Sequence, residues 1–592
     1  MSSLPPGLIF ILGAVLLPLL PGKIRSATYL VFPLLAFATI VNLEVGSSLV
    51  VPVLSWELVL LQVDRLSLAF GYVFIIMTFL GGIYAFHVKD VGQQSASLLY
   101  AGSALGVCFA GDLLTLFVFW ELMLVGSSLL IWSRRTAQSG RAGTRYFLVH
   151  FVAGILLLAG IWLHMDKTGS LLIGPVAGSL ASTLILISFA VNAAVPPLHA
   201  WLPDAYPEGT VTGSVFLSAF TTKVAVYALI RCFAGFEPLI WVGTIMAIYG
   251  VVFAILQNDV RRLLSYHIVS QVGYMVAAVG IGTEMAINGA TAHAFTHILY
   301  KALLFMGAGA VLHTTGRSKL SELGGLARSM PLTLILYMIG ALSISAFPLF
   351  SGFVSKSMVV YAAGQNHMGA VVLLMYLVSI ATFLSVGLKL PYFTWLGSDR
   401  ALRPSATPVG MYVSMALTAG LCIAIGVYPS LLYDVLPFTV TYQPYTMAKV
   451  VETMQLLGFT GLGFWLLVHR LEGKNYMTLD TDWFYRRLPG LVYVLAYRLF
   501  ALLGGQRAHV FFRGLPGLLR GHAVLTGRRI YEFSGSLPTL ANRLARGLFD
   551  VSGGRQVYER TLPLFREYSR DIALGALFVA VLLALFLILT LV

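Results

Sequence analysis

Long runs of hydrophobic residues dominate the chain, and only short polar stretches separate them. About sixteen of these runs approach the roughly 20 residues that an α-helix needs to cross a lipid bilayer. The predicted spans are 7–21, 27–43, 65–86, 95–110, 113–132, 146–164, 181–202, 211–233, 238–256, 264–282, 288–313, 331–364 (interrupted), 369–396, 408–428, 450–470 and 571–591. The short alternating strands of an outer-membrane barrel do not fit this pattern. The chain is therefore predicted to be an all-α polytopic membrane protein. Its first span lacks a basic leader and a cleavage site, which predicts a retained helix.

Composition narrows the class further. Hydrophobic residues make up 58% of the 592 residues and charged residues only 10%, whereas a soluble domain has about 25% charged residues. The three cysteines, Cys108, Cys232 and Cys422, lie inside apolar runs, which excludes a disulfide scaffold and a cysteine zinc site. We expect no cofactor and no metal. We also expect no nucleic-acid partner, because membrane topology explains the positive charge more simply.

The charged residues are distributed unevenly between the loops. The net charge is +14, and basic residues concentrate in the loops that follow odd-numbered spans. They are Lys23, Arg25, Lys89, Arg134, Arg135, Arg141, Arg145, Arg261, Arg262, Arg317, Lys319, Arg328, Arg400 and Arg403. Under the positive-inside rule these loops face the cytoplasm, and both termini lie outside. The acidic loop after the seventh span, with Asp204 and Glu208, is the exception.

The stretch 472–570 differs from the rest of the chain. It carries 15 Lys and Arg against 7 Asp and Glu, a net charge of +8, and Gly, Pro and Arg break its apolar stretches. Its frequent Leu and aromatic residues favour amphipathic helices at the cytoplasmic membrane surface, or along neighbouring subunits, over a disordered basic linker. Residues 571–592 are predicted to form a separate terminal transmembrane helix.

Ionisable residues inside apolar spans are costly and are therefore candidates for function. Glu121 is the only carboxylate of its span, in FWELMLVG, and Lys223 lies in SAFTTKVAVYAL. A buried glutamate needs either a cation or a proton, and a lysine held away from water can lose and regain a proton near neutral pH. The alternatives are a structural, hydrogen-bonding Glu121 and a Lys223 that reaches toward the membrane surface.

His293, His297 and Lys301 occupy positions i, i+4 and i+8 of HAFTHILYKALLF, so one face of a helix carries all three. A stripe of titratable side chains is what proton transfer across a membrane requires. Two histidines four residues apart can also bind zinc, but the glutamate of the H-E-x-x-H pattern is absent here. A proton relay is therefore preferred over a metal site or a purely structural stripe.

Two spans contain helix breakers. Lys356 lies in FPLFSGFVSKSMVV, in a span that Pro348 and Gly352 interrupt, and VPPLHAWLPD interrupts the seventh span in the same way. Broken helices at membrane depth occur where they line a cavity or are buried in protein. Their corresponding positions in two halves of the chain indicate internal repeats and an ion path.

Three further ionisable residues have weaker support. Lys389, in FLSVGLKLPYF, is one more intramembrane base, although it could lie near the membrane interface. His267, in LLSYHIVSQVGYM, and His150, in RYFLVHFVAG, are lone histidines. Such histidines are core residues as often as they are relay groups.

These residues resemble a known family, the antiporter-like subunits shared by respiratory complex I, membrane-bound hydrogenases and Mrp-type cation/proton antiporters. The matching segments are FWELMLVGSSLL (119–130), VPPLHAWLPDAY (195–206), GSVFLSAFTTKVAVYAL (213–229), DVRRLLSYHIVSQVGYM (259–275), HAFTHILYKALLF (293–305) and FPLFSGFVSKSMV (347–359). They cover roughly residues 60–400, and the forms SYHIVSQVGYM and TTKVAVYAL look most like the D-type subunits of Mrp antiporters. The resemblance implies about fourteen core helices, with two inverted five-helix repeats that contain broken helices.

The resemblance also implies a domain organisation and residue roles. The parts are N-terminal helices 1–94, a first repeat 95–235, a second repeat 236–400, C-terminal core helices 401–471, the interfacial segment 472–570 and the terminal helix 571–592. The resemblance implies that Glu121 senses the neighbouring subunit and that Lys223 is the helix-8 lysine of the family. His293, His297 and Lys301 would form the central axis. Lys356 would be the helix-12 exit group, and Lys389 would be the helix-13 lysine of the Mrp type.

One position departs from the family pattern. The family usually has a lysine on helix 7, five residues before the proline of P-L-x-x-W-L, where this chain has Asn192. Asparagine cannot carry a proton in the same way, so Glu121 would lose its usual ion-pair partner. Either Lys223 or His150 takes over this role, or the first half-channel is altered or silent.

The preferred function is that of a proton-translocating subunit of a multisubunit Na⁺/H⁺ antiporter in a bacterial inner membrane, with other membrane subunits as partners. One alternative is a proton-pumping subunit of a redox complex, either complex I-like or a membrane hydrogenase. Such a complex would need its iron–sulfur clusters in other subunits, because this chain has no cysteines to hold them. Another alternative is an energising or structural subunit for an inorganic-carbon uptake partner.

Overall fold

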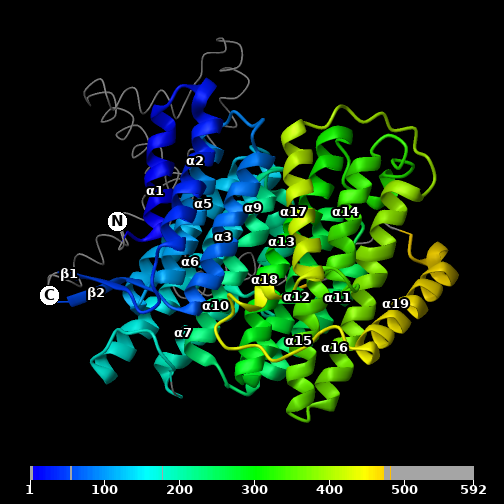
Figure 1. The fold of residues 1–592 in the computed structure, drawn as a ribbon. Helices are drawn as coiled ribbons and strands as arrows, with labels where there is room; N and C mark the ends of the chain where they lie inside the picture. Colours follow the sequence, from blue (N-terminus) through cyan, green and yellow to red (C-terminus); the bar gives the residue numbers. More distant parts are fainter. Residues whose placement is uncertain (1–3, 54–55, 177, 473–479, 482–592) are drawn as a thin grey trace, which may run out of the picture. The chain divides into compact units, whose positions relative to one another are not determined.

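The computed structural model describes the chain from residue 4 to residue 472 almost without gaps. The described ranges are 4–53, 56–176, 178–472 and 480–481 (Figure 1). Eleven helices of the described residues are long and apolar enough to cross a membrane, which confirms the prediction of a helical multi-pass membrane protein. Apart from residues 472, 480 and 481, the predicted interfacial segment 472–570 and the terminal helix 571–592 lie outside the described residues.

The first part of the chain follows the predicted spans. Its helices are α1 (Pro6–Leu16) with the 3₁₀ turn η1 (Leu17–Leu19), α2 (Gly22–Val41), α3 (Arg65–Tyr84), α4 (Val91–Phe109), α5 (Leu113–Trp132), α6 (Ala137–Thr168) and α7 (Leu180–Asn192). Asp64, Asp90 and Asp112 cap the starts of α3, α4 and α5, each accepting a hydrogen bond from the N–H three residues later. Such caps satisfy N–H groups that a helix start leaves unpaired. They explain why these helices begin where they do.

A β-hairpin packs against α4 and α5, where the sequence pattern does not predict one. Strand β1 (Ser48–Val53) pairs with the antiparallel strand β2 (Trp56–Gln62). The N–H of Val59 donates to Asp112 Oδ2 at 2.7 Å, and the N–H of Gly111 donates to the Val59 carbonyl at 2.9 Å. Asp112 therefore caps α5 and fixes the hairpin with the same carboxylate.

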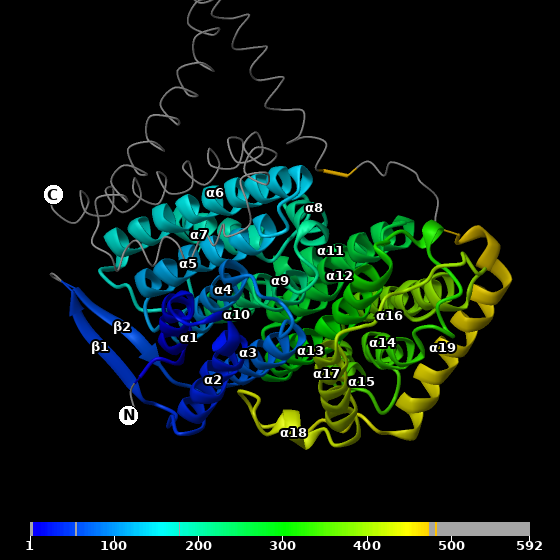
Figure 2. The same cartoon turned by 90° about the horizontal axis from the view of Figure 1, so that it is seen from above.

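The second part of the chain contains the broken helices and the most deeply buried ones. Its elements are α8 (Trp201–Ala205), η2 (Tyr206–Glu208), α9 (Gly213–Ala219), α10 (Thr221–Phe233), α11 (Pro238–Leu256), α12 (Val260–Ile281), α13 (Glu284–Thr315), η3 (Leu320–Glu322), α14 (Pro331–Ile344), α15 (Ser351–Gln365), α16 (Gly369–Thr382), the π-helical turns η4 (Phe383–Lys389) and η5 (Tyr392–Leu396), α17 (Val409–Val427), α18 (Ser430–Tyr433), α19 (Met447–Leu467) and η6 (Val468–Arg470). Helix α13 packs against α3 and α9 on one side and against α14 and α15 on the other (Figure 2). It therefore joins the two halves of the helical core.

The break after α7 and the break after α14 have the same main-chain geometry. Each contains an alanine with positive φ, Ala194 at 60° and Ala346 at 57°, followed two residues later by Pro196 or Pro348. In both, the residue after that alanine donates its N–H to the carbonyl five residues earlier, at 2.9 and 3.0 Å. Both predicted interruptions are present, and their matching geometry supports internal repeats. The inverted topology of those repeats stays a prediction.

Two further helices are irregular at positions where the sequence has no helix-breaking residue. α9 and α10 are separated at Phe220, where ψ is −72°, and α16 continues into the π-helical turn η4. Each irregularity lies next to a predicted site residue, Lys223 in the first case and Lys389 in the second. Irregular helical turns are frequent at functional sites because they leave main-chain carbonyls without their usual partners.

Candidate functional site

The predicted stripe of α13 lies in the interior of the helical core. The side chains of His293, His297 and Lys301 are all 0% exposed. His293 Nδ1 lies 3.2 Å from Ser355 Oγ on α15, and the ring centroids of His293 and His297 are 6.3 Å apart. Lys301 Nζ and both ring nitrogens of His297 have no hydrogen-bond partner among the described residues. Buried polar atoms are rarely left unpaired, so these groups call for an explanation beyond stability.

The lysines of the irregular helices bind main-chain carbonyls instead of carboxylates. The acceptors are the carbonyl of Ser218 for Lys223 at 2.5 Å, that of Ile344 for Lys356 at 2.7 Å and that of Ile255 for Lys389 at 2.6 Å. These carbonyls belong to the last turns of α9, α14 and α11. The C-terminal end of a helix carries partial negative charge, which stabilises an ammonium group. Each break thus positions a lysine without fixing its charge through a counter-ion.

Six of the predicted groups form one electrostatic cluster. They are Lys223, His267, His293, His297, Lys301 and Lys356. The charges of Lys223, Lys301 and Lys356 act on His297, so the cluster extends from α10 through α13 to α15. Because all six groups are bases, a proton on one of them disfavours a proton on the next. The protonation of each base therefore depends on the protonation of its neighbours.

Gly352 explains how α15 comes close enough to α14 for this arrangement. A Cβ at residue 352 would collide with the carbonyl oxygen of Ser343 in the last turn of α14. Glycine therefore lets the first turn of α15 lie against the end of α14, and the ammonium of Lys356 reaches back to Ile344 across the break. The sequence analysis identified Gly352 only as a helix breaker.

Glu121 on α5 lies apart from the cluster. Its carboxylate packs against Gly154 on α6, where a Cβ would collide with Oε1. Oε1 has no hydrogen-bond partner among the described residues, and no charged group there acts on Glu121. Neither Lys223 nor His150 forms an ion pair with it, since Lys223 binds Ser218 and His150 Nδ1 lies 2.9 Å from the Tyr146 carbonyl.

Asn192 and Lys389 also lie outside the cluster. Asn192 is the last residue of α7 and is 1% exposed, and its Oδ1 has no hydrogen-bond partner among the described residues. Lys389 Nζ donates to the main-chain carbonyls of Ile255 at 2.6 Å and Gln257 at 3.4 Å. The structure therefore brings together six of the eight predicted site residues.

A group of buried hydroxyls next to Lys223 is missing from the sequence-based site. Tyr146 on α6 donates to Ser127 Oγ on α5 at 2.9 Å and lies 3.4 Å from Thr221 Oγ1. Thr221, at the start of α10, lies 2.7 Å from the hydroxyl of Tyr100 on α4. Isolated serines, threonines and tyrosines occur in many apolar helices, so only the three-dimensional contact reveals this hydroxyl cluster of Tyr100, Ser127, Tyr146 and Thr221.

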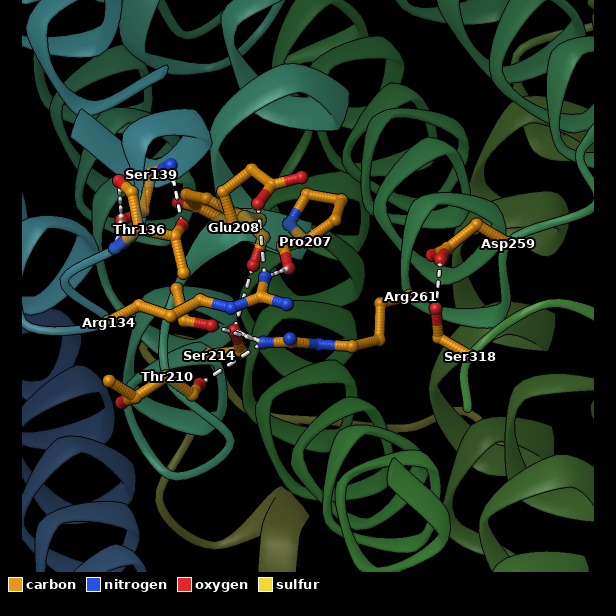
Figure 3. A network of polar contacts seen from close by, with 12 residues as sticks. Arg134, Thr136, Ser139, Pro207, Glu208, Thr210, Ser214, Asp259, Arg261 and Ser318 are labelled. Atoms are coloured by element: carbon orange, nitrogen blue, oxygen red, sulfur yellow. Dashed lines mark hydrogen bonds and ion pairs between the residues drawn. The ribbon is translucent and has the colours of Figure 1, made fainter. Parts of the chain in front are cut away.

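The acidic loop after the seventh span neutralises basic loops at the same end of the helices. Arg145 binds Asp204 through two hydrogen bonds of 2.7 and 2.9 Å, and Arg134 binds Glu208 at 3.1 Å. Figure 3 shows Glu208 close to Arg134 and Arg261, which is only 2% exposed. Burial raises the pKa of Glu208 even though Arg134 and Arg261 act in the opposite direction. The exception to the loop-charge pattern is thus an ion-pair network at one end of the helices, and the side of the membrane on which this end lies stays a prediction.

The described residues contain no group of three His, Cys, Asp or Glu side chains that could hold a metal ion. In that part of the chain, His293 and His297 have no carboxylate or thiolate beside them to complete a coordination sphere. The residues of the cluster are nitrogen bases, which are able to accept and release protons.

Comparison with known proteins identifies relatives of the chain. Residues 110–385 match the family described as NADH:quinone oxidoreductase/Mrp antiporter, TM. An uncharacterized protein of Methanocaldococcus jannaschii is 32% identical over 364 residues, which are 57% of this chain and 75% of that protein. The D subunit of the Na(+)/H(+) antiporter of Alkalihalophilus pseudofirmus is 34% identical over 322 residues, or 51% of this chain and 65% of that protein. The chain thus spans just under two thirds of the length of the antiporter protein.

Solved structures share the fold. A chain of the Mrp complex from Dietzia sp. DQ12-45-1b matches with a TM-score of 0.64 and 24% identity. The match covers 78% of this chain and 94% of that chain. The fold of an antiporter-like membrane subunit is therefore common to both.

Proposed function

Because the chain belongs to the NADH:quinone oxidoreductase/Mrp antiporter transmembrane family, we propose that it is a proton-translocating subunit of a multisubunit Na⁺/H⁺ antiporter. The observation that carries this proposal is Lys301, an ammonium-bearing side chain that is 0% exposed and has no hydrogen-bond partner among the described residues. A charged side chain inside a membrane protein is expensive, by several kcal/mol, unless it is paired. An unpaired lysine in the centre of the fold is therefore better explained by proton exchange than by stability.

The path that we propose runs through the electrostatic cluster. A proton held at Lys223 passes to the Lys301 and His297 region, because the charges of Lys223 and Lys301 both act on His297. From there it passes along α13 to His293, whose Nδ1 faces Ser355 of α15 at 3.2 Å. A histidine accepts a proton on one ring nitrogen and releases one from the other, which suits it for relay between neighbours.

Lys356 completes the path within the second half. Its helix begins one turn before Ser355, and its ammonium is held by the Ile344 carbonyl at the break. A carbonyl acceptor stabilises the charged lysine without neutralising it, so that the lysine can return its proton to a neighbouring water or base. His267, which lies 2.6 Å from Ser385 Oγ, joins α12 to the η4 turn beside this site.

The role that we propose for Glu121 is contact with a neighbouring subunit. Its carboxylate lies at the middle of α5, and no cation of the described residues pairs with it. Since Asn192 stands where the family usually has a lysine, the balance of charge at Glu121 must come from a proton or from a group of another subunit. The protonation of a buried carboxylate that has no fixed counter-ion depends on the charge of the groups around it.

The partners and location follow from the same proposal. Other membrane subunits of a hetero-oligomeric complex surround the chain, the transported ions are protons and Na⁺, and the membrane is the inner membrane of a bacterial cell. The Arg145–Asp204 and Arg134–Glu208 ion pairs support a common cytoplasmic side for the loops that carry them. Both termini then lie on the outer side.

A proton-pumping subunit of a redox complex is the second candidate function. The family description, which joins NADH:quinone oxidoreductases with Mrp antiporters, favours it, because both kinds of complex contain this transmembrane fold. The row of buried bases serves either function. What distinguishes them is the source of energy, which lies in the partner subunits.

Purification of the tagged chain from its native membrane in mild detergent, with identification of the co-purifying proteins by mass spectrometry, tests the proposal. Small hydrophobic subunits without redox cofactors, together with Na⁺-dependent proton exchange in inverted membrane vesicles, are the expected result. Partner subunits with iron–sulfur clusters or flavin would overturn the antiporter proposal and favour the redox complex. A chain that purifies alone and exchanges no protons would contradict both.

A further inference from the structure

A cavity connects Lys356 with helix α19, a helix that the path described so far does not use. The cavity has a volume of about 40 Å³ and is lined by Lys356, Tyr274, Tyr376 and Lys449, among others. Such a volume has room for about three or four water molecules, since one water needs roughly 10–15 Å³. Lys356 Nζ lies 5.2 Å from the centre of the Tyr274 ring on the cavity wall. The cavity therefore lies directly next to the last base of the cluster and has room for water.

Polar side chains continue from this cavity to the protein surface. Lys449 Nζ donates to the hydroxyl of Tyr376 at 2.7 Å and to Glu452 Oε2 at 3.0 Å. The hydroxyl of Tyr376 also interacts with the Glu452 carboxylate. The Lys449 side chain is 19% exposed and that of Glu452 is 41% exposed, so Glu452 lies nearer to the protein surface than Lys449. Tyr376, Lys449 and Glu452, which we name the outer triad, thus link the cavity to the surface.

The outer triad lies at the end of the helices away from the basic loops. Lys449 and Glu452 are in the first turns of α19, and Tyr376 lies near the middle of α16. In Figure 1 the turn between α15 and α16 lies at the bottom, whereas the loop that follows η5 and carries Arg400 and Arg403 lies at the top. A path through the outer triad therefore opens on the side opposite to the loops that we expect in the cytoplasm.

We propose that the outer triad is the outward end of the proton path, through which protons pass between Lys356 and the medium. This inference rests on the proposed function. A proton released by the Lys356 ammonium is taken up by water in the cavity and transferred to the Tyr376 hydroxyl, which passes its own proton to the Glu452 carboxylate. Glu452 then releases a proton to the medium, and Lys449 holds the two acceptors in place. Each step moves one proton from a donor to the neighbouring acceptor, and no other reactant is needed.

An anchoring role for α19 is the competing explanation. Lys449 and Glu452 lie three residues apart on the same helix, so their ion pair does not tie α19 to any other element. Among the contacts of the triad, the Lys449–Tyr376 hydrogen bond and the Tyr376–Glu452 interaction connect α19 to α16, and α19 also packs against α16 and η4. An ion pair that adds little to anchoring, placed beside a cavity at Lys356, is better explained by transfer than by attachment.

Glu452→Gln and Tyr376→Phe in the complete complex test the proposal, with Tyr361→Phe as the matched control. Tyr361 lies one helix away on α15, and its hydroxyl accepts a hydrogen bond from Gln365 at the exposed surface. We expect proton exchange in membrane vesicles to fall by about 100-fold or more in both triad variants, because a positioned acid–base group contributes roughly 10²–10⁴-fold. The control is expected to keep the wild-type rate, and all three variants to assemble to the same level on native gels.

A second experiment tests from which side of the membrane the cavity is accessible, without a measurement of transport. Thr453, which lines the cavity next to Glu452, is replaced by Cys, and a membrane-impermeant thiol reagent is added from the outer side. Labelling from that side but not from the opposite side is expected, because the three native cysteines are buried. Normal exchange in both triad variants, or labelling only from the other side, overturns this inference alone when Lys301→Ala still abolishes exchange. Loss of proton exchange in the wild-type complex itself would instead contradict the proposed function.

Discussion

Gly154 of α6 lies directly against the carboxylate of Glu121 of α5, because a Cβ at residue 154 would overlap Oε1. Glu121 has no other fixed partner among the described residues, so the space at Gly154 determines where its carboxylate sits. Gly154→Val is therefore expected to displace Glu121 and to lower proton exchange as much as Glu121→Gln does. Proton exchange in vesicles, normalised to the amount of assembled complex, measures the effect.

Gly420→Val is the matched control for this experiment. Gly420 lies on α17, and a Cβ there meets no atom within 4 Å, so the added methyl groups face no obstacle. Overpacking inside a protein costs about 1–3 kcal/mol, and the control separates the general effect of a glycine-to-valine change in a helix from displacement of the carboxylate. Equal transport in Gly154→Val and wild type would mean that the position of Glu121 does not matter.

The hydroxyl of Tyr146 links α5, α6 and α10 beside Lys223. It donates to Ser127 and approaches Thr221, which lies two residues before Lys223. We expect Tyr146→Phe to slow proton exchange about fivefold, the kinetic equivalent of the roughly 1 kcal/mol that a neutral hydrogen bond contributes. Tyr412→Phe on α17, whose hydroxyl makes no hydrogen bond to a described residue, is expected to leave the rate unchanged.

A substitution of Asn192 tests whether the position of the usual helix-7 lysine still takes part in proton transfer. Its amide carries no exchangeable charge, and its buried Oδ1 has no partner among the described residues. Asn192→Leu, which has the same branched shape, is expected to keep proton exchange within about twofold and not to reduce stability, since an unpaired buried polar group is lost. A large loss of exchange in a stably assembled variant would mean that Asn192 orders part of the path.

The pKa of His87 leads to a prediction of how the stability of the complex changes with pH. Burial and the neighbouring charge of His313, whose ring centroid is 5.3 Å away, lower the pKa of His87. The unfolded chain therefore binds the proton at His87 more readily than the folded chain does. The contribution of neutral His87 to stability is fully present above about pH 6.5 and is lost as the pH falls below that value. His87→Gln is expected to narrow the difference between the thermal midpoints of the purified complex at pH 7.5 and pH 5.5. An unchanged difference would contradict this account of His87.

The sequence predicted the helical membrane fold because hydrophobic runs of bilayer length report helices directly. It also predicted the breaks after α7 and α14, since Pro196 and Pro348 cannot continue a helix. The hairpin of β1 and β2 has no comparable signal, because its brief alternation is hidden in a chain that is apolar throughout. The break at Phe220 lacks a breaker residue, and tertiary contacts of Tyr100 with Thr221 accompany it.

The candidate site was predictable to the extent that ionisable residues in apolar spans are conspicuous. Lys223, Lys356 and the α13 stripe were found in this way, and the structure gathers them in one cluster. Tyr146 and Tyr376 were not found, since a tyrosine in an apolar helix looks the same whether or not its hydroxyl has a partner. Their significance lies in contacts between residues far apart in the sequence, at separations of 75 residues for Tyr146 to Thr221 and 73 for Tyr376 to Lys449.

The most direct test of the central claim is the initial rate of proton exchange in vesicles that contain the complex with Lys301→Ala. Lys301 is the base that joins the two halves, so we expect the rate to fall by about 100-fold or more, in line with the loss of a positioned proton-transfer group. The amount of assembled complex, measured on native gels, is expected to stay at the wild-type level, because no hydrogen bond of Lys301 to a described residue is lost. Exchange at a near-normal rate in the assembled variant would contradict a proton path through the centre of α13.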